Sequence, residues 1–169
     1  MRATTTTTTD DPTTRTHIEA HPDLPWIRIV RDFAAPRARV FRAWIDPDLV
    51  TQWLGPKDLE LRIEHWDGRT GGSYRYTNWR DGEQIAGFYG SFHEVRPDER
   101  LVQTFTYDGV PDGVSLETAT FDDLPDGGTR VTVLSLVENL VARDQMLASG
   151  MEHGVREGYE KLDQLLATG

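Results

Sequence analysis

The sequence predicts an α+β fold in which a curved, seven-stranded antiparallel sheet wraps around one long C-terminal helix. Three observations predict this fold. One alternating segment is followed by two short helical segments, six more alternating segments follow in hairpin succession, and the chain ends in a long amphipathic segment. A sheet with one apolar face must cover that face, and the last segment is the only helix long enough to do so.

The first strand is predicted over Trp26–Phe33, where apolar and polar residues alternate. Pro36 can then open a helix over Arg37–Ile45, because proline is tolerated in the first helical turn. Asp46 can cap a second short helix, which Gly55 and Pro56 end. Two short helices are therefore expected directly after the first strand.

Six further strands are predicted because turn-forming residues separate the next alternating segments. Asp67-Gly68 and Asp81-Gly82 are both hairpin-turn signals. Consecutive hairpins give an antiparallel sheet. The predicted strands cover residues 59–66, 73–77, 84–95, 100–107, 114–121 and 130–138.

The final segment, Arg143 to Ala167, is predicted to form one long amphipathic helix. Gly150, Gly154 and Gly158 recur every four residues along one side of its apolar face. Each glycine inside a helix costs about 1 kcal/mol relative to alanine, so this pattern needs a physical reason. Either another backbone packs very closely there, or the helix leaves room for a molecule that is not protein.

The 169 residues predict one domain, preceded by a short tail. Residues 1–22 contain an unbroken run of threonines and no apolar periodicity, so we expect a disordered tail there. Residues 23–169 are then the folded domain. The tail lacks the apolar core of a signal peptide, and no apolar run is long enough to span a bilayer.

Composition excludes several classes of function. The chain has no cysteine, which removes disulfides, zinc–thiolate sites and thiol nucleophiles. Its formal net charge of −10 argues against nucleic acid and anionic membranes as partners. We expect a cytoplasmic protein, either a monomer or a homodimer.

Four sequence clusters carry a resemblance to a known family over roughly residues 24–167. They are VFRAWIDP at 40–47 with QWLGP at 52–56, DGRTGGSY at 67–74, PDERL at 97–101 with TF at 104–105, and GMEHGVREGYEKL at 150–162. The chain resembles the START-like, helix-grip superfamily, also called SRPBCC or Bet-v-like. More narrowly, it is similar to the bacterial family named for homology to the C-terminal domain of the heat-shock chaperone ATPase activator. This resemblance implies the helix-grip fold, but the fold hosts many functions.

Aromatic residues recur on the strand faces that should meet the last helix. Aromatic walls with a few polar tips suit a flat, apolar ligand, and together with the glycine pattern they indicate unfilled space. The alternative is that these side chains simply fill the core. The predicted ligand-binding residues are Trp44, Trp53, His65, Tyr74, Tyr76, Phe88, Phe92, Phe105, Tyr107, Met146, Gly150 and Met151.

Two polar residues are candidates for acid–base chemistry. His65 falls on the apolar side of its strand, where it could act as a base or orient a ligand carbonyl, although a lone histidine there is more often a core residue. By alternation, Glu94 shares a face with Phe88 and Phe92, near the expected cavity. The alternative for Glu94 is an ion pair with an arginine such as Arg100.

Standard catalytic and cofactor motifs are absent from the sequence. It contains no Gly-x-Ser-x-Gly, no Gly-x-Gly-x-x-Gly and no phosphate-binding loop. His17 and His21 are four residues apart but lie in the predicted tail, so no metal site is expected. We therefore expect no cofactor.

Three functions remain open. The first is a binding protein for a small hydrophobic or aromatic molecule, held between the sheet and the last helix. The second is an enzyme resembling polyketide cyclases or dehydratases, which would use the same pocket with His65, Tyr74, Tyr76 or Glu94 as acid or base. The third is a co-chaperone. It ranks last because the resembling eukaryotic activators use a separate N-terminal domain, whereas only the short tail precedes the fold here.

Overall fold

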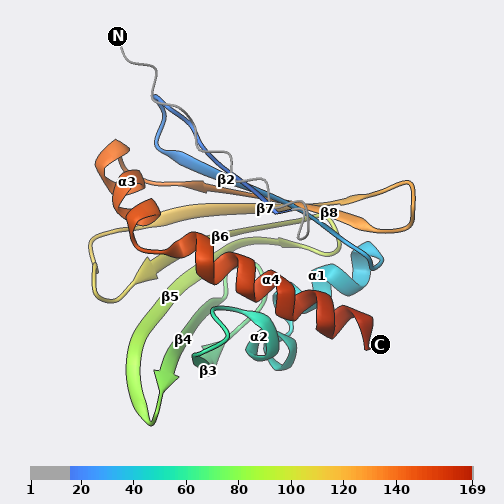
Figure 1. Ribbon diagram of the computed structural model, residues 1–169, viewed down its shortest axis with the longest axis horizontal. Helices are drawn as coiled ribbons and strands as arrows, with labels where there is room; N and C mark the ends of the chain where they lie inside the picture. Colours follow the sequence, from blue (N-terminus) through green and yellow to red (C-terminus); the bar gives the residue numbers. More distant parts are fainter. Residues whose placement is uncertain (1–15, 169) are drawn as a thin grey trace.

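The computed structural model describes residues 16–168, which form an eight-stranded antiparallel sheet and four helices (Figure 1). The sheet order is β1-β2-β8-β7-β6-β5-β4-β3. The strands are β1 (His17–Ala20), β2 (Trp26–Phe33), β3 (Glu60–Trp66), β4 (Ser73–Arg80), β5 (Glu83–Arg96), β6 (Arg100–Tyr107), β7 (Ser115–Asp123) and β8 (Thr129–Leu136). The helices are α1 (Arg37–Ile45), α2 (Pro47–Trp53), α3 (Leu140–Ala148) and α4 (Met151–Ala167).

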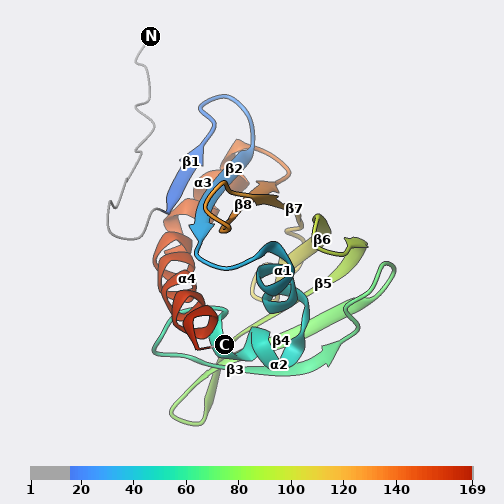
Figure 2. The same cartoon turned by 90° about the vertical axis from the view of Figure 1, so that its right-hand side faces the viewer.

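The sheet curls around α4, as the end-on view shows (Figure 2). The strands pass from β1 and β2 at one edge to β4 and β3 at the other, and α4 lies on the concave side. Helices α1 and α2 also lie on the concave side, and α2 packs closely on α4. The predicted α+β architecture is therefore confirmed. Within residues 16–168, no helix is long and apolar enough to cross a membrane.

The predicted number of strands was one too few. The additional strand, β1, pairs with β2 and lies inside residues 1–22, which the sequence assigned to the tail. Its position is held by Arg31, whose Nε donates to Thr16 Oγ1 at 3.0 Å, and by Arg156, which donates to the Thr16 carbonyl at 3.2 Å. Hydrogen bonds between residues distant in sequence cannot be recognised from the sequence, and a four-residue strand is too short to show an alternating pattern. Residues 1–15 of the predicted tail lie outside the described residues.

The prediction of a single long C-terminal helix was also wrong, because the segment forms two helices, α3 and α4. Gly150 has a φ of +84°, a left-handed conformation that interrupts the helix between α3 and α4. A Cβ at Gly150 would meet nothing within 4 Å, so this glycine makes no close packing contact. Its conformation therefore accounts for the glycine at position 150.

The other two glycines lie inside α4 and differ in their surroundings. A Cβ at Gly158 would lie 3.1 Å from the carbonyl oxygen of Trp53, so this glycine lets α4 approach the end of α2 closely. A Cβ at Gly154 would make only an ordinary contact, 3.7 Å from Cδ of Pro56. Close packing is thus the reason for glycine at one of the three positions.

Dense packing is concentrated at the end of the interior where α1, α2 and the second half of α4 meet the sheet. The Trp44 ring lies 4.6 Å from Trp53, 5.5 Å from Phe121 and 5.9 Å from both Phe33 and Tyr159, measured between ring centroids. Trp53 also donates from Nε1 to the carbonyl of Ala43 at 2.8 Å. We call this the packed end of the interior.

Candidate functional site

The opposite end of the interior is built differently. It lies where β7 begins, where β8 ends, and where α3 and the first turns of α4 meet the sheet (Figure 1). Helix α3 has no fully buried residue, and the buried residues of α4 all lie from Gly158 onward. The apolar side chains that α3 and the first turns of α4 pack against the core are only partly buried. They are Met146, Leu147, Met151 and Val155. We call this the open end of the interior.

A carboxylate lies on the concave face at the open end. Glu117 in β7 shares its strand face with Ala119 and Phe121, both of which are buried in the core. Across the sheet, its register partners are Gln103 in β6 and Ser135 in β8. The alternation of β7 therefore points a charged side chain toward the helices.

Glu117 has little to stabilise its charge. Its one hydrogen bond comes from Ser135 Oγ, 3.4 Å from Oε1, and no cation of residues 16–168 lies within ion-pair distance. Burial raises the pKa of the Glu117 carboxyl to about 7, and the Ser135 hydrogen bond offsets part of that rise. The group can therefore gain or lose a proton near neutral pH, as a general acid or base must.

An aromatic row crosses the concave face beside this carboxylate. Tyr74 and Tyr76 stack at 6.2 Å on β4, and Phe88 lies 5.2 Å from Tyr76. Phe88 in turn lies 5.3 Å from Phe105 and 5.5 Å from Tyr107. Burial raises the pKa of both the Tyr74 and the Tyr76 hydroxyls, with the Glu117 charge as a further cause, so neither tyrosine ionises near neutral pH.

The predicted ligand-binding residues are divided between the two ends. Trp44 and Trp53 belong to the packed end, and Phe92 is fully buried against Trp66 and Tyr74. Gly150 is exposed between α3 and α4, and a Cβ added there would meet nothing within 4 Å. On the concave face or on the helices of the open end lie Tyr74, Tyr76, Phe88, Phe105, Tyr107, Met146 and Met151.

His65 was predicted to face the interior, and this was wrong. The β3–β4 register shifts between Ile63 and His65, so that His65 lies opposite Arg75 on the convex face. Its Nε2 lies 3.0 Å from Ser73 Oγ, and the side chain is exposed. A one-residue bulge reverses the face of every later residue in a strand, which simple alternation cannot detect.

A second bulge explains Glu94 in the same way. The β5–β6 register shifts between Phe92 and Glu94, which puts Glu94 opposite Val102. Its Oε1 lies 3.2 Å from Arg100 Nε and 3.0 Å from Arg96 Nη2. The alternative expectation, an ion pair with Arg100, is confirmed, and the expectation that Glu94 lies near the interior is wrong.

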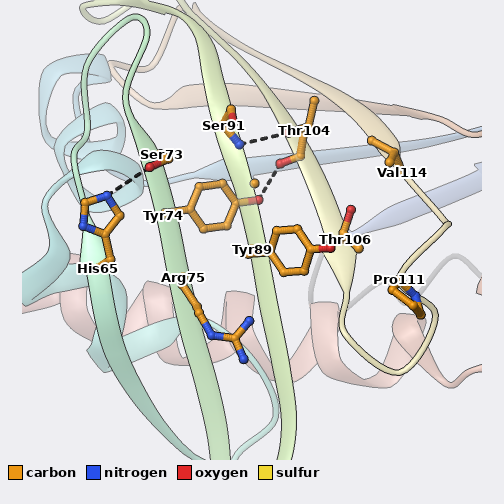
Figure 3. A pocket seen from close by; sticks show the side chains of 11 residues that line it. His65, Ser73, Tyr74, Arg75, Tyr89, Ser91, Thr104, Thr106, Pro111 and Val114 are labelled. Atoms are coloured by element: carbon orange, nitrogen blue, oxygen red, sulfur yellow. Dashed lines mark hydrogen bonds between the residues drawn. The ribbon is translucent and has the colours of Figure 1, made fainter.

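The convex face carries a separate pocket of about 570 Å³ beneath the β6–β7 loop (Figure 3). Several of its polar groups already have partners within the protein. His65 contacts Ser73, the amide of Ser91 donates to Thr104 Oγ1 at 2.9 Å, and the Tyr74 hydroxyl donates to the Thr104 carbonyl at 2.6 Å. Arg75 is paired with two carboxylates, at 2.9 and 3.1 Å. Because these side chains already bond to one another, the pocket has fewer polar groups to offer a ligand.

Glu117 was not identified from the sequence, although a signal for it was present. The segment SLETATF places Ser115, Glu117, Ala119 and Phe121 at alternate positions of one predicted strand. A glutamate among residues that face the core is unusual, because ionisable side chains are rarely buried without a partner. An ionisable residue at a core-facing strand position is therefore the sequence signal that could have identified Glu117.

An antiparallel sheet that curls around a C-terminal helix defines the helix-grip class of α+β proteins. The chain belongs to the family described as Activator of Hsp90 ATPase homolog 1-like protein, whose model matches residues 34–167. No match was found among curated proteins.

Solved structures share this fold. A Rhodobacter sphaeroides protein is 25% identical with a TM-score of 0.82, over 91% of this chain and 99% of that one. An Arthrobacter aurescens protein is 26% identical with a TM-score of 0.81, over 90% and 91%. DynU16, a protein in the dynemicin biosynthetic locus, is 24% identical with a TM-score of 0.61, over 86% of this chain and 48% of DynU16. The last likeness shows the fold alone.

Proposed function

We propose that this protein binds a small hydrophobic or aromatic molecule at the open end of the interior, between the sheet and helices α3 and α4. One observation carries the proposal. Glu117 shares the concave face of β7 with the buried core residues Ala119 and Phe121, yet its own side chain is only partly buried. That combination is typical of a side chain that borders internal space.

The surroundings of Glu117 support the same proposal. The apolar side chains of α3 and the start of α4 that contact the core are only partly buried, whereas most of the aromatic rings around Trp44 at the packed end are buried: Phe33, Trp53, Phe121 and Tyr159. A well-packed interior leaves few voids, so incomplete burial on both sides of one region favours a ligand site. The aromatic row supplies flat apolar walls beside it.

Filling the site tests this proposal. Val155→Trp adds a large ring on a half-buried position of α4, and Met151→Trp is a second variant of the same kind. Val141→Trp is the matched control, because Val141 is 66% exposed. We expect the filling variants to lower the affinity for 1-naphthylmethanol by at least about ten-fold in calorimetry, whereas the control binds like the unmodified protein.

Native mass spectrometry of the purified protein gives an independent measurement. A co-purifying small molecule that is retained by Val141→Trp and lost from Val155→Trp would support the site. Unchanged naphthylmethanol affinity in two folded filling variants would contradict it.

A second candidate is an enzyme with cyclase- or dehydratase-like activity, favoured by the pKa of about 7 at Glu117. Aldol cyclisation needs a base to remove a proton next to a carbonyl and an acid to assist loss of water. The test is incubation with heptane-2,6-dione, which would give 3-methylcyclohex-2-enone and water. Enzyme activity predicts that Glu117→Gln abolishes this product while the diketone still binds. An equal rate in both proteins would contradict it.

A further inference from the structure

We propose that Glu117 selects ligands that carry a protonated amine, so that the interior site binds hydrophobic amines in preference to matched neutral or anionic molecules. This inference rests on the proposed function and adds the chemical class of the ligand. It follows from the single hydrogen bond that Glu117 accepts, from the lack of a paired cation among the described residues, and from the neutral aromatic groups around it.

The first step is the incomplete hydrogen bonding of Glu117. A carboxylate can accept about four hydrogen bonds, and this one accepts a single long one from Ser135, at 3.4 Å. The neighbouring amide of Gln103 is committed elsewhere, because its Nε2 donates to the Tyr74 hydroxyl at 3.2 Å. Most of the carboxylate's accepting capacity is therefore free for a donor that enters the interior.

The second step is the absence of a protein cation for Glu117 among the described residues. Arg31 is the buried cation of the concave face, and Asp163 of α4 already pairs with it, at 2.5 and 3.1 Å. Its remaining donors bind Thr16 Oγ1 and the carbonyl of Asp32. Buried charges are normally paired, so a compensating charge for Glu117 would have to come from the ligand.

The third step concerns the remaining walls. From β4 and α4 the groups that face this region are the hydroxyls of Tyr74, Tyr76 and Tyr159, whose pKa values burial raises, so they stay neutral. The faces of Phe88 and Phe105 carry negative electrostatic potential, which attracts an ammonium group as well. An ammonium group on an apolar body matches both the carboxylate and the rings.

One more polar atom at this end lacks a partner. Ser115 lies two residues before Glu117 on the same face of β7, and its buried Oγ has no hydrogen-bond partner among the described residues. Unpaired buried hydroxyls are rare because each costs free energy. Ser115 can accept a second hydrogen bond from an ammonium group, which has three donors.

The test compares three probes that share one ring system. They are 1-naphthylmethylamine, 1-naphthylmethanol and 1-naphthoate, measured by isothermal titration calorimetry at pH 7.5 on the full chain. We expect the amine to bind at least about ten-fold more tightly than the alcohol, because a charge-assisted hydrogen bond replaces a neutral one. We expect the naphthoate to bind least well.

Two variants separate a specific contact from general attraction to an acidic protein. Glu117→Gln should abolish the preference for the amine, so that the amine and the alcohol bind this variant with affinities within about two-fold of each other. Glu60→Gln is the matched control, because Glu60 is an exposed glutamate paired with Arg62 on an edge strand, and it should keep the preference. Proton release on binding of the amine, and not of the alcohol, should appear as buffer-dependent enthalpy in the unmodified protein.

The outcomes distinguish this inference from the proposed function. If all three probes bind with equal affinity, or if Glu117→Gln keeps the amine preference, the inference is overturned and the binding site stands. If none of the three probes binds, both are overturned. The comparison of the three probes in the unmodified protein decides the inference even if Glu117→Gln fails to fold.

Discussion

The hydroxyl of Ser135 lies 3.4 Å from Oε1 of Glu117, and it is the carboxylate's one hydrogen-bond partner within residues 16–168. The two residues face each other across β7 and β8, at the end of the sheet where α3 begins. This single long hydrogen bond offsets only part of the rise in the pKa of Glu117 that burial causes.

Stability should fall as pH rises through the range in which Glu117 ionises in the folded state. Burial raises its pKa to about 7, from 4.5 in an unfolded chain, so between these values the folded state binds more protons. The contribution is fully present below pH 4.5 and is lost as pH approaches and passes 7. Replacing Glu117 with glutamine removes this loss. The variant should therefore gain stability over the unmodified protein, by up to roughly 3 kcal/mol, between pH 5 and pH 8.

Urea unfolding of both proteins across this pH range measures the difference. Glu60→Gln serves as the control, because Arg62 lowers the pKa of Glu60, so any pH dependence from that carboxyl lies below pH 4.5 and outside this range. A difference between Glu117→Gln and the unmodified protein that does not vary with pH would show that this carboxylate does not titrate near neutrality.

Alanine at the two glycines inside α4 should have opposite effects on stability. Gly154→Ala should raise the free energy of unfolding by up to about 1 kcal/mol, because its Cβ meets only Pro56 at 3.7 Å and alanine favours the helix. Gly158→Ala should lower it by about 1–2 kcal/mol, because its Cβ would lie 3.1 Å from a backbone oxygen of Trp53. Equilibrium urea unfolding of each variant gives both values, and an equal gain in both would refute the close approach of α4 to α2.

Removing Asp163 should cost far more than removing an exposed carboxylate of the same kind. The partner of Asp163 is Arg31, whose side chain is 5% exposed and would stay buried with an uncompensated charge. Asp163→Ala should cost about 2 kcal/mol, less than a fully buried pair because Asp163 itself is partly exposed. Glu60→Ala breaks a pair with the exposed Arg62 and should cost under about 0.5 kcal/mol. Thermal unfolding compares the two, and equal losses would contradict the structural role of Arg31.

The fold could be predicted from the sequence because most of its elements have local signals. Asp46 caps α2 as expected, accepting a hydrogen bond from the amide of Asp48 at 3.0 Å. Strand β1 could not be predicted, because its four residues are too few to show an alternating pattern and it is recognised only by its pairing with β2. The break at Gly150 was missed because a glycine at helical spacing looks the same whether or not it is helical.

The candidate site was predicted in kind but not in its polar residues. The aromatic row follows from alternation within β4, β5 and β6. His65 and Glu94 were placed on the wrong face because each follows a bulge, which shifts the register by one residue and depends on how two strands pair. Strand β7, which contains Glu117, has no such bulge. The inward direction of Glu117 could therefore have been predicted from its neighbours Ala119 and Phe121.

The position of a bound ligand is the most direct test of the central claim that the open end of the interior is a binding site. The chain has three methionines, and two of them, Met146 and Met151, lie on α3 and at the start of α4. Protein labelled with ¹³C at its methionine methyl groups is titrated with 1-naphthylmethanol, and Met146→Leu assigns the signals. We predict that saturating probe shifts the signals of both residues and gives nuclear Overhauser effects from the naphthalene ring to their methyl groups. Saturation that leaves both signals unchanged would contradict the claim.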